Sequence, residues 1–207
     1  EVFIDSATLR ENVVSLAKNI GYTPRSRKSS RTTINFFVDV SGLTTSPLTL
    51  TLKAGVVATS SQRLGNLSFT FTIPSDITVP VVNGVADFNN VTIYEGSYVC
   101  ERFTVDSSIP NQRFLLGNSS VDTGSLRVKV FETEQSTSHK NYNLKTNLFD
   151  VTATSEVFFL QEIEDQRYEI LFGDGIFGKK LDNDNYIEAC YSVTSGENGN
   201  NISQFAF

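Results

Sequence analysis

The chain has 207 residues, of which 39% are hydrophobic and 19% charged, and its formal net charge at pH 7 is −6. This composition is typical of a folded globular protein rather than a disordered one, and the acidic balance argues against a surface that binds nucleic acid over its whole extent. No apolar run approaches the ~20 residues that a membrane-spanning helix needs, and the lack of methionine indicates a segment of a longer polypeptide.

The first expected element is an amphipathic helix over residues 8–20. Its apolar residues recur at helical spacing and form one stripe, made of Leu9, Val13, Leu16, Ala17 and Ile20. Gly21 suits the left-handed position that ends a helix, and Pro24 prevents its continuation. One helix with one apolar stripe needs a partner, which is either the β part of this chain or a helical bundle with other subunits.

A basic connector follows at residues 25–31, with four positive charges in seven positions. Its interpretations are a solvated connector, a contact with an acidic neighbouring subunit, or a contact with nucleic acid. Together with the apolar stripe, the connector supplies the candidate interface residues, which are Leu9, Val13, Leu16, Ile20, Arg25, Arg27 and Arg31.

Beyond residue 31 the apolar period changes from 3.6 to 2, which predicts half-buried strands with one polar face. The alternation occurs at residues 48–52, 67–73, 99–105, 126–130 and 168–172. Asn83-Gly84 separates two apolar stretches and is a strong signal for a two-residue hairpin turn. No helical pattern of sufficient length separates the strands, so parallel βαβ units are not expected.

These patterns predict a mainly β protein with an N-terminal α-helix, built from antiparallel sheets in sandwich-like β domains, with minor α+β character. The helix and basic connector occupy residues 1–30. A first β domain is expected at residues 31–108 and a second at residues 109–207, with a seam around residues 107–110, where the chain reads Ser-Ser-Ile-Pro.

Few residues point to chemistry. Cys100 and Cys190 are too few for a disulfide framework or a zinc site; a single disulfide between them is one interpretation, and two free thiols in a reducing cytoplasm is the favoured one. The single histidine, His139, has no second His or Cys nearby and is expected in a surface loop.

Two loops invite comparison with known ligand-binding motifs. Residues 182–185 (DNDN) lack the glycine and distal glutamate of a calcium loop, and predict a hairpin turn between strands around Ile176 and Ile187. Residues 173–179 (GDGIFGK) lack the spacing of a phosphate-binding loop and predict a structural turn. We therefore expect no catalytic, cofactor or metal site, and no enzyme.

Several strings, in this order along the chain, resemble baseplate wedge proteins of contractile-tailed, myovirus-type bacteriophages, in the baseplate J-like family. Residues 12–26 are similar to the helix-to-strand entry of that family, and residues 101–105 with 109–114 to its central segment. The most recognisable string is residues 168–179 (YEILFGDGIFGK), and a gapped Gly and Asn pattern follows at residues 196–201.

The resemblance implies a structural subunit of the tail baseplate wedge, located in the virion and assembled in the host bacterial cytoplasm. It implies that copies pair as dimers in the wedge and join, with other wedge subunits, into a higher-order ring around the hub that rearranges during sheath contraction. Such a switch needs interfaces with two packings and not a catalytic pocket. No cofactor, nucleic acid, membrane or small-molecule partner is implied.

Two other hypotheses compete with this one. A β-sandwich adhesin or receptor-binding module of a phage or bacterial surface would explain the threonine-rich strands, but it leaves the helix and the strings unexplained. A tail-associated hydrolase would need an acidic pair at the right separation, and the sequence singles out no such pair.

Overall fold

The computed structural model describes residues 26–60 and 68–207. The protein is mainly β, with 51% of the described residues in strands, and its sheets are largely antiparallel. Within the described residues the only helical segments are two 3-10 turns, η2 (Glu164–Gln166) and η3 (Gly196–Gly199). The helix predicted over residues 8–20 lies outside the described residues.

The described residues divide into two compact units that do not follow the predicted domain boundaries. Unit 1 contains residues 26–27 and 100–191, and unit 2 contains residues 28–60, 68–99 and 192–207. The seam expected at residues 107–110 falls inside unit 1, where the Ser107 backbone N–H and hydroxyl both donate to Asn183 Oδ1 (2.9 and 3.0 Å). The prediction assumed domains that are contiguous in sequence, whereas the last residues return to unit 2.

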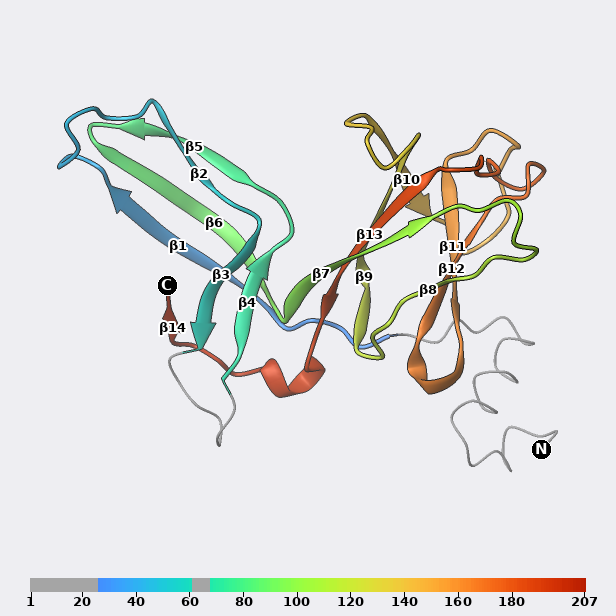
Figure 1. Ribbon diagram of the computed structural model, residues 1–207. Helices are drawn as coiled ribbons and strands as arrows, with labels where there is room; N and C mark the ends of the chain where they lie inside the picture. Colours follow the sequence, from blue (N-terminus) through green and yellow to red (C-terminus); the bar gives the residue numbers. More distant parts are fainter. Residues whose placement is uncertain (1–25, 61–67) are drawn as a thin grey trace. The chain divides into compact units, whose positions relative to one another are not determined.

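Unit 2 is an antiparallel β unit organised around one long strand. Its strands are β1 (Arg31–Asp39), β2 (Thr49–Leu52), β3 (Gly55–Ser60), β4 (Thr70–Ile73), β5 (Ile77–Val82), β6 (Val85–Glu95) and β14 (Phe205–Ala206). Their order is β14-β3-β4-β6-β5-β2, and β1 pairs with β6 (Figure 1). Because β6 pairs with β5 near its start and with β4 near its end, this strand joins the two halves of the sheet.

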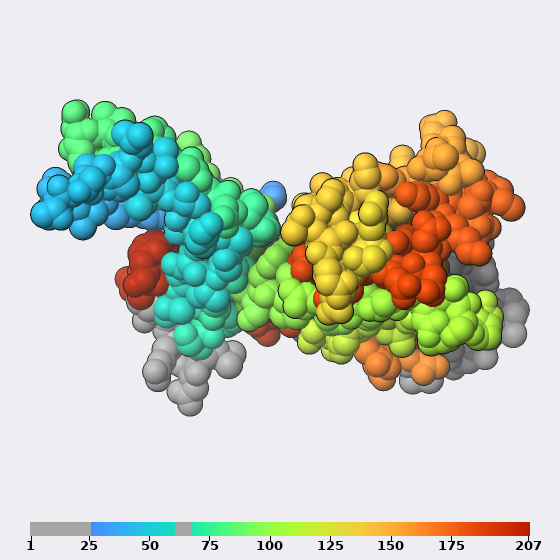
Figure 2. All heavy atoms as spheres, turned by 45° about the horizontal axis from the view of Figure 1, so that its top comes forward, coloured from blue at the N-terminus to red at the C-terminus, as the bar shows by residue number. Residues whose placement is uncertain are grey.

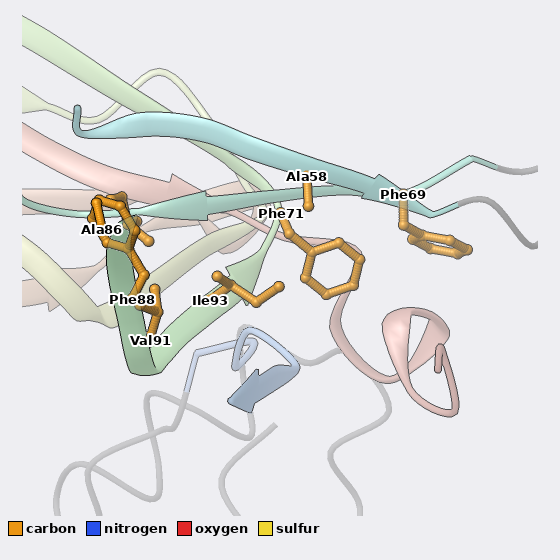
Figure 3. Close-up of a cluster of buried hydrophobic side chains, with 8 residues drawn as sticks. Ala58, Phe69, Phe71, Ala86, Phe88, Val91 and Ile93 are labelled. Atoms are coloured by element: carbon orange, nitrogen blue, oxygen red, sulfur yellow. The ribbon is translucent and has the colours of Figure 1, made fainter. Parts of the chain in front are cut away.

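The core of unit 2 collects the inward-facing apolar side chains of these strands. Figure 3 shows this cluster, which comprises Ala58, Phe69, Phe71, Ile73, Ala86, Phe88, Val91 and Ile93. Phe36 of β1 stacks on Phe88 with ring centroids 4.9 Å apart. The alternation predicted around β4 holds only in part, since Thr72 is also buried and its hydroxyl donates to the Tyr94 carbonyl oxygen (3.4 Å).

The predicted Asn83-Gly84 hairpin is confirmed. These two residues connect β5 to β6, and Val82 lies opposite Val85. Asn83 has φ 52° and Gly84 φ 80°, the positive values that a two-residue turn of this kind requires.

The second seven-stranded sheet has the order β7-β13-β9-β10-β11-β12-β8 and lies in unit 1, except that residues 97–99 of β7 and 192–193 of β13 belong to unit 2. Its strands are β7 (Ser97–Thr104), β8 (Phe114–Leu115), β9 (Val121–Phe131), β10 (His139–Leu144), β11 (Val157–Glu162), β12 (Tyr168–Phe172) and β13 (Tyr186–Val193). Leu126, Val128 and Val130 are buried on β9, as the alternation of this segment predicts.

One strand pair in unit 1 departs from the predicted antiparallel pattern. β10 and β11 run parallel, with Asn143 opposite Val157 and Leu144 opposite Phe158. Parallel neighbours need a connection that returns the chain to the same end of the sheet, and residues 145–156 provide one without a helix.

The favoured prediction of two free thiols is wrong. Cys100 of β7 and Cys190 of β13 form a disulfide, with Cα atoms 4.0 Å apart. The two strands run in opposite directions, since Arg102 pairs with Glu188 and the Val105 backbone N–H donates to the Asn185 carbonyl oxygen (2.9 Å). The cysteines are 90 residues apart in sequence, so only this strand pairing brings them together.

Candidate interaction surface

Two of the segments that carry the family resemblance, residues 109–114 and 168–179, pack against each other in unit 1. β8 pairs antiparallel with β12, which places Phe114 opposite Ile170. The Arg113 guanidinium binds the Glu169 carboxylate through two bonds, Nε to Oε1 (2.8 Å) and Nη2 to Oε2 (2.6 Å). Phe114 also contacts Phe103 and Phe172 edge to face. Residues far apart in the sequence therefore share one packing arrangement.

The Arg113–Glu169 pair makes stability dependent on pH. Glu169 is buried, and the hydrogen bonds from Arg113 lower the pKa of its carboxyl. A lowered folded-state pKa contributes stability above the unfolded-state pKa, and this contribution is lost as the pH falls through the folded-state value.

We expect Arg113→Ala to leave a buried carboxylate without its cation and to lower the stability of unit 1 at neutral pH. The difference from wild type should shrink as the pH falls through the lowered folded-state pKa of Glu169, because a protonated carboxyl no longer needs the cation. Urea unfolding at pH 7 and at pH 3 measures both. Arg102→Ala is the matched control, since its contact with Glu188 is longer (3.3 Å) and Lys129 also neutralises Glu188. Equal losses in the two variants would contradict the argument.

The glycine turn that follows β12 is held by side-chain hydrogen bonds and presents two apolar side chains to solvent. Asp174 Oδ1 accepts hydrogen bonds from the backbone N–H groups of Ile176 (2.8 Å) and Phe177 (2.9 Å), and these bonds lower the Asp174 pKa. A Cβ atom on Gly173 would lie 2.1 Å from the Gly178 carbonyl carbon, so only glycine fits. Ile176 is nevertheless 68% exposed.

The loop between β10 and β11 exposes two further apolar side chains. Phe149 is 80% exposed and Leu148 51% exposed. The loop is ordered by local bonds, in which Asn147 Oδ1 accepts from the Phe149 N–H (3.2 Å) and the Ser155 hydroxyl accepts from the Thr152 N–H (3.0 Å). Large apolar side chains that are exposed on a hydrogen-bonded loop indicate a binding role for that loop rather than poor packing.

The two loops lie side by side in unit 1. The Gly178 N–H donates to the Thr152 carbonyl oxygen (3.1 Å), and the Lys179 N–H to that of Ser155 (2.8 Å). Both views show the loops adjoining at the same end of the unit (Figure 1, Figure 2). We call Leu148, Phe149, Ile176 and Phe177 the apolar loop patch.

A polar network ties β7 to β13 within unit 1. The Tyr191 hydroxyl donates to the Glu101 carboxylate, which also accepts the Gly117 N–H (2.9 Å), and the Asn118 amide donates to the Tyr191 oxygen (2.8 Å). Burial raises the Tyr191 pKa to about 12, so the phenol stays protonated as a donor at neutral pH. The network holds the strands in place.

The string at residues 196–201 lies in unit 2 and has a local structural explanation. Gly196 and Asn201 have positive φ, both 66°. Glu95 is buried and accepts from the Thr194 hydroxyl (2.6 Å). A Cβ on Gly199 would lie 2.7 Å from Glu95 Cγ, so glycine lets this segment pack on β6.

Among the predicted interface residues, Leu9, Val13, Leu16, Ile20 and Arg25 lie outside the described residues. Arg27 and Arg31 are exposed. Lys28 is exposed as well. The serines between these charges pack on the fold, since Ser29 is buried and the Ser26 hydroxyl accepts the Thr123 N–H (3.0 Å).

The remaining sequence candidates lie in β10 and in two turns between β12 and β13. His139 is exposed as predicted, but it begins β10 rather than lying in a loop, and its ring is 5.2 Å from that of Phe131. The turn at residues 182–185 is confirmed, since the Asn185 N–H donates to the Asp182 carbonyl oxygen (3.2 Å). The prediction of a strand around Ile176 is wrong, because Asp174 holds that segment in the glycine turn.

The sequence reading missed the apolar loop patch. The available signal was two short apolar pairs, Leu148-Phe149 and Ile176-Phe177, each flanked by turn-forming residues. Within residues 26–60 and 68–207, no group of three or more His, Cys, Asp or Glu side chains is placed to hold a metal ion. No helix in that part of the chain is long and apolar enough to cross a membrane.

No protein-family model matches the chain, and no curated protein matches it either.

Proposed function

We propose that this chain is a structural subunit of the tail baseplate wedge of a contractile-tailed phage and acts through protein–protein contacts rather than catalysis. In this role it helps to form the ring around the hub that rearranges during sheath contraction. Its partners are further copies of itself and other wedge subunits, and its place is the virion baseplate, after assembly in the host cytoplasm.

One observation carries the proposal. The string that most closely resembles the baseplate family, residues 168–179, ends in the turn that exposes Ile176 and Phe177. Monomeric proteins seldom expose clustered large apolar side chains without a use for them, and aromatic side chains are enriched at protein interfaces. The apolar loop patch is therefore our candidate for a contact with another wedge subunit.

The patch is held ready for binding by its own hydrogen bonds. Asp174 fixes the glycine turn, and Asn147 with Ser155 fixes the other loop. A surface ordered before binding loses less conformational entropy on association. The helix predicted over residues 8–20 would supply a second contact, in a bundle with partner subunits, and that part stays a sequence-based prediction.

Replacing Phe149 and Ile176 by serine should weaken assembly with the other wedge proteins at least about 10-fold, because exposed aromatic and aliphatic anchors carry much of the energy of an interface. Both side chains are largely in solvent, so the thermal stability of the isolated chain should change little. Light scattering of the full-length protein, alone and mixed with wedge partners, gives the mass of each complex.

Leu48→Ser is the matched control, since Leu48 is 89% exposed and lies in unit 2. It should leave assembly unchanged. A double variant that assembles like wild type would exclude the patch as the contact, and a wild-type protein that ignores every wedge partner would overturn the proposed function itself.

The disulfide favours a second candidate, an adhesin or receptor-binding module at a phage or bacterial surface. Disulfides persist in oxidising surroundings and are rare in the cytoplasm, and Cys100–Cys190 belongs to the fold. A released virion also meets oxidising surroundings, but the wedge subunit of the first proposal assembles earlier, in the reducing host cytoplasm. Glycan-array screening separates them, because specific glycan binding by a protein that does not assemble would select the adhesin.

A further inference from the structure

β1 (Arg31–Asp39) is an edge strand with little protection against pairing. Among the described residues it pairs only with β6 (Figure 1). Its sequence, RTTINFFVD, is rich in β-branched and aromatic residues, lacks proline, and has no charge between its two ends. Natural edge strands usually carry an internal lysine, a proline or a bulge that blocks edge-to-edge pairing.

The backbone of β1 offers its outer hydrogen-bonding groups at odd-numbered residues. The Ser30 carbonyl oxygen accepts the Glu95 N–H (2.7 Å), and the Val40 N–H donates to the Gly84 carbonyl oxygen (2.8 Å). Even-numbered positions therefore face β6 at both ends of the strand. The register shift after Ile34 adds its extra residue to β6 and leaves this alternation on β1 intact.

The side chains of the same odd-numbered residues are exposed, and the two charged ones, of opposite sign, stand at the two ends of the strand. They are Arg31, Thr33, Asn35, Phe37 and Asp39. Phe37 is 67% exposed, which is unusual for a phenylalanine on a strand. Hydrogen bonds from Ser41 hold the pKa of Asp39 below its usual value, so the strand carries a positive charge at its start and a negative charge at its end.

We propose that β1 is a self-association edge, on which β1 of a second copy pairs antiparallel about a twofold axis at Asn35. Arg31 then lies opposite Asp39 of the partner subunit, and Thr33 opposite Phe37 of the partner subunit. Every odd-numbered residue faces another odd-numbered residue, so the pairs exchange about ten backbone hydrogen bonds in all.

Charge selects this arrangement over its alternatives. Parallel pairing of two β1 strands would place Arg31 beside Arg31 of the partner subunit and Asp39 beside Asp39 of the partner subunit, and like charges across strands are destabilising. A shift of one residue would set odd against even positions and break the hydrogen-bond pattern. Only the register centred on Asn35 keeps the hydrogen-bond pattern and also places opposite charges across from each other at both ends of the strand.

This inference goes beyond the proposed function and does not depend on it, since it concerns unit 2 and not the apolar loop patch. A protein that dimerises through β1 but ignores wedge partners would uphold the inference and overturn the proposed function. A protein that assembles with wedge partners but does not dimerise through β1 would uphold the proposed function and overturn the inference.

Charge reversal tests the register. Sedimentation equilibrium of the whole chain should show a dimer, and Arg31→Asp or Asp39→Arg alone should raise its dissociation constant roughly 10- to 100-fold, because each turns two attractive pairs into repulsive ones. The double variant Arg31→Asp with Asp39→Arg should restore dimerisation. A monomeric wild type, or a dimer unaffected by both single variants, overturns the proposal.

Cross-linking provides a second test that does not rely on affinity. Asn35→Cys should form a disulfide-linked dimer on mild oxidation, because position 35 faces itself in this register. Thr33→Cys should not, since its counterpart is four residues out of register, about 13 Å away along the strands. Equal cross-linking of the two variants would overturn the register.

Discussion

Reduction of the Cys100–Cys190 disulfide is expected to lower the free energy of unfolding of unit 1 by about 4 kcal/mol. The bond joins residues 90 positions apart, so it removes a large loop-closure entropy from the unfolded chain. It also joins β7 to β13, which carries the buried Tyr191 of the polar network. Urea unfolding with and without reductant measures the loss.

The variant Cys100→Ala with Cys190→Ala is the control for reductant effects. It should unfold at the lower urea concentration of the reduced wild type and should not respond to reductant. Hydrogen exchange measured on peptides from β7 and β13 locates the change in unit 1. A wild type whose thiols are shown to be free but whose midpoint is unchanged would contradict this prediction.

Gly173→Ala is expected to destabilise unit 1 by about 3 kcal/mol or more, which places it among the more severe single substitutions. The added methyl group would lie 2.1 Å from the Gly178 carbonyl carbon and 2.2 Å from its oxygen. Both atoms belong to the backbone, so no flexible side chain can move aside. Thermal unfolding of the variant measures the cost.

Gly42→Ala is the matched control, because a Cβ at Gly42 has no heavy atom within 4 Å. It should change stability by no more than about 0.5 kcal/mol. Since Gly173 sets the turn that presents Ile176 and Phe177, its variant should also lose binding to any partner of the apolar loop patch. Unchanged stability and unchanged binding would show that the turn relaxes more easily than its geometry implies.

The two candidate interaction surfaces lie on different units. The apolar loop patch belongs to unit 1, and β1 belongs to unit 2. A ring subunit needs at least two distinct contacts, one within a pair and one between neighbours. Separate variants in the patch and in β1 therefore report on different steps of assembly.

Local chemistry made much of the β structure predictable. Alternation at residues 126–130 placed Leu126, Val128 and Val130 on one buried face, because side chains of a strand point to opposite sides in turn. Asn83-Gly84 predicted its hairpin, because its turn depends on backbone conformations that few residues adopt. These features depend only on neighbours in sequence.

Tertiary structure decided what depends on distant residues. Nothing near Cys100 indicates that Cys190 will lie across from it, because strand order and register bring them together. The same applies to Arg113 with Glu169, and to the parallel pairing of β10 with β11.

For the two candidate surfaces too, the sequence shows one part and the tertiary structure decides the other. The composition of β1 and its terminal charges, Arg31 and Asp39, are visible in the sequence, but its position at a sheet edge is not, because any strand of that composition also suits a sheet centre. Likewise, Leu148-Phe149 and Ile176-Phe177 are visible as apolar pairs. Their exposure and their adjacency follow from the bonds that hold the two loops together, and these bonds exist only in the folded chain.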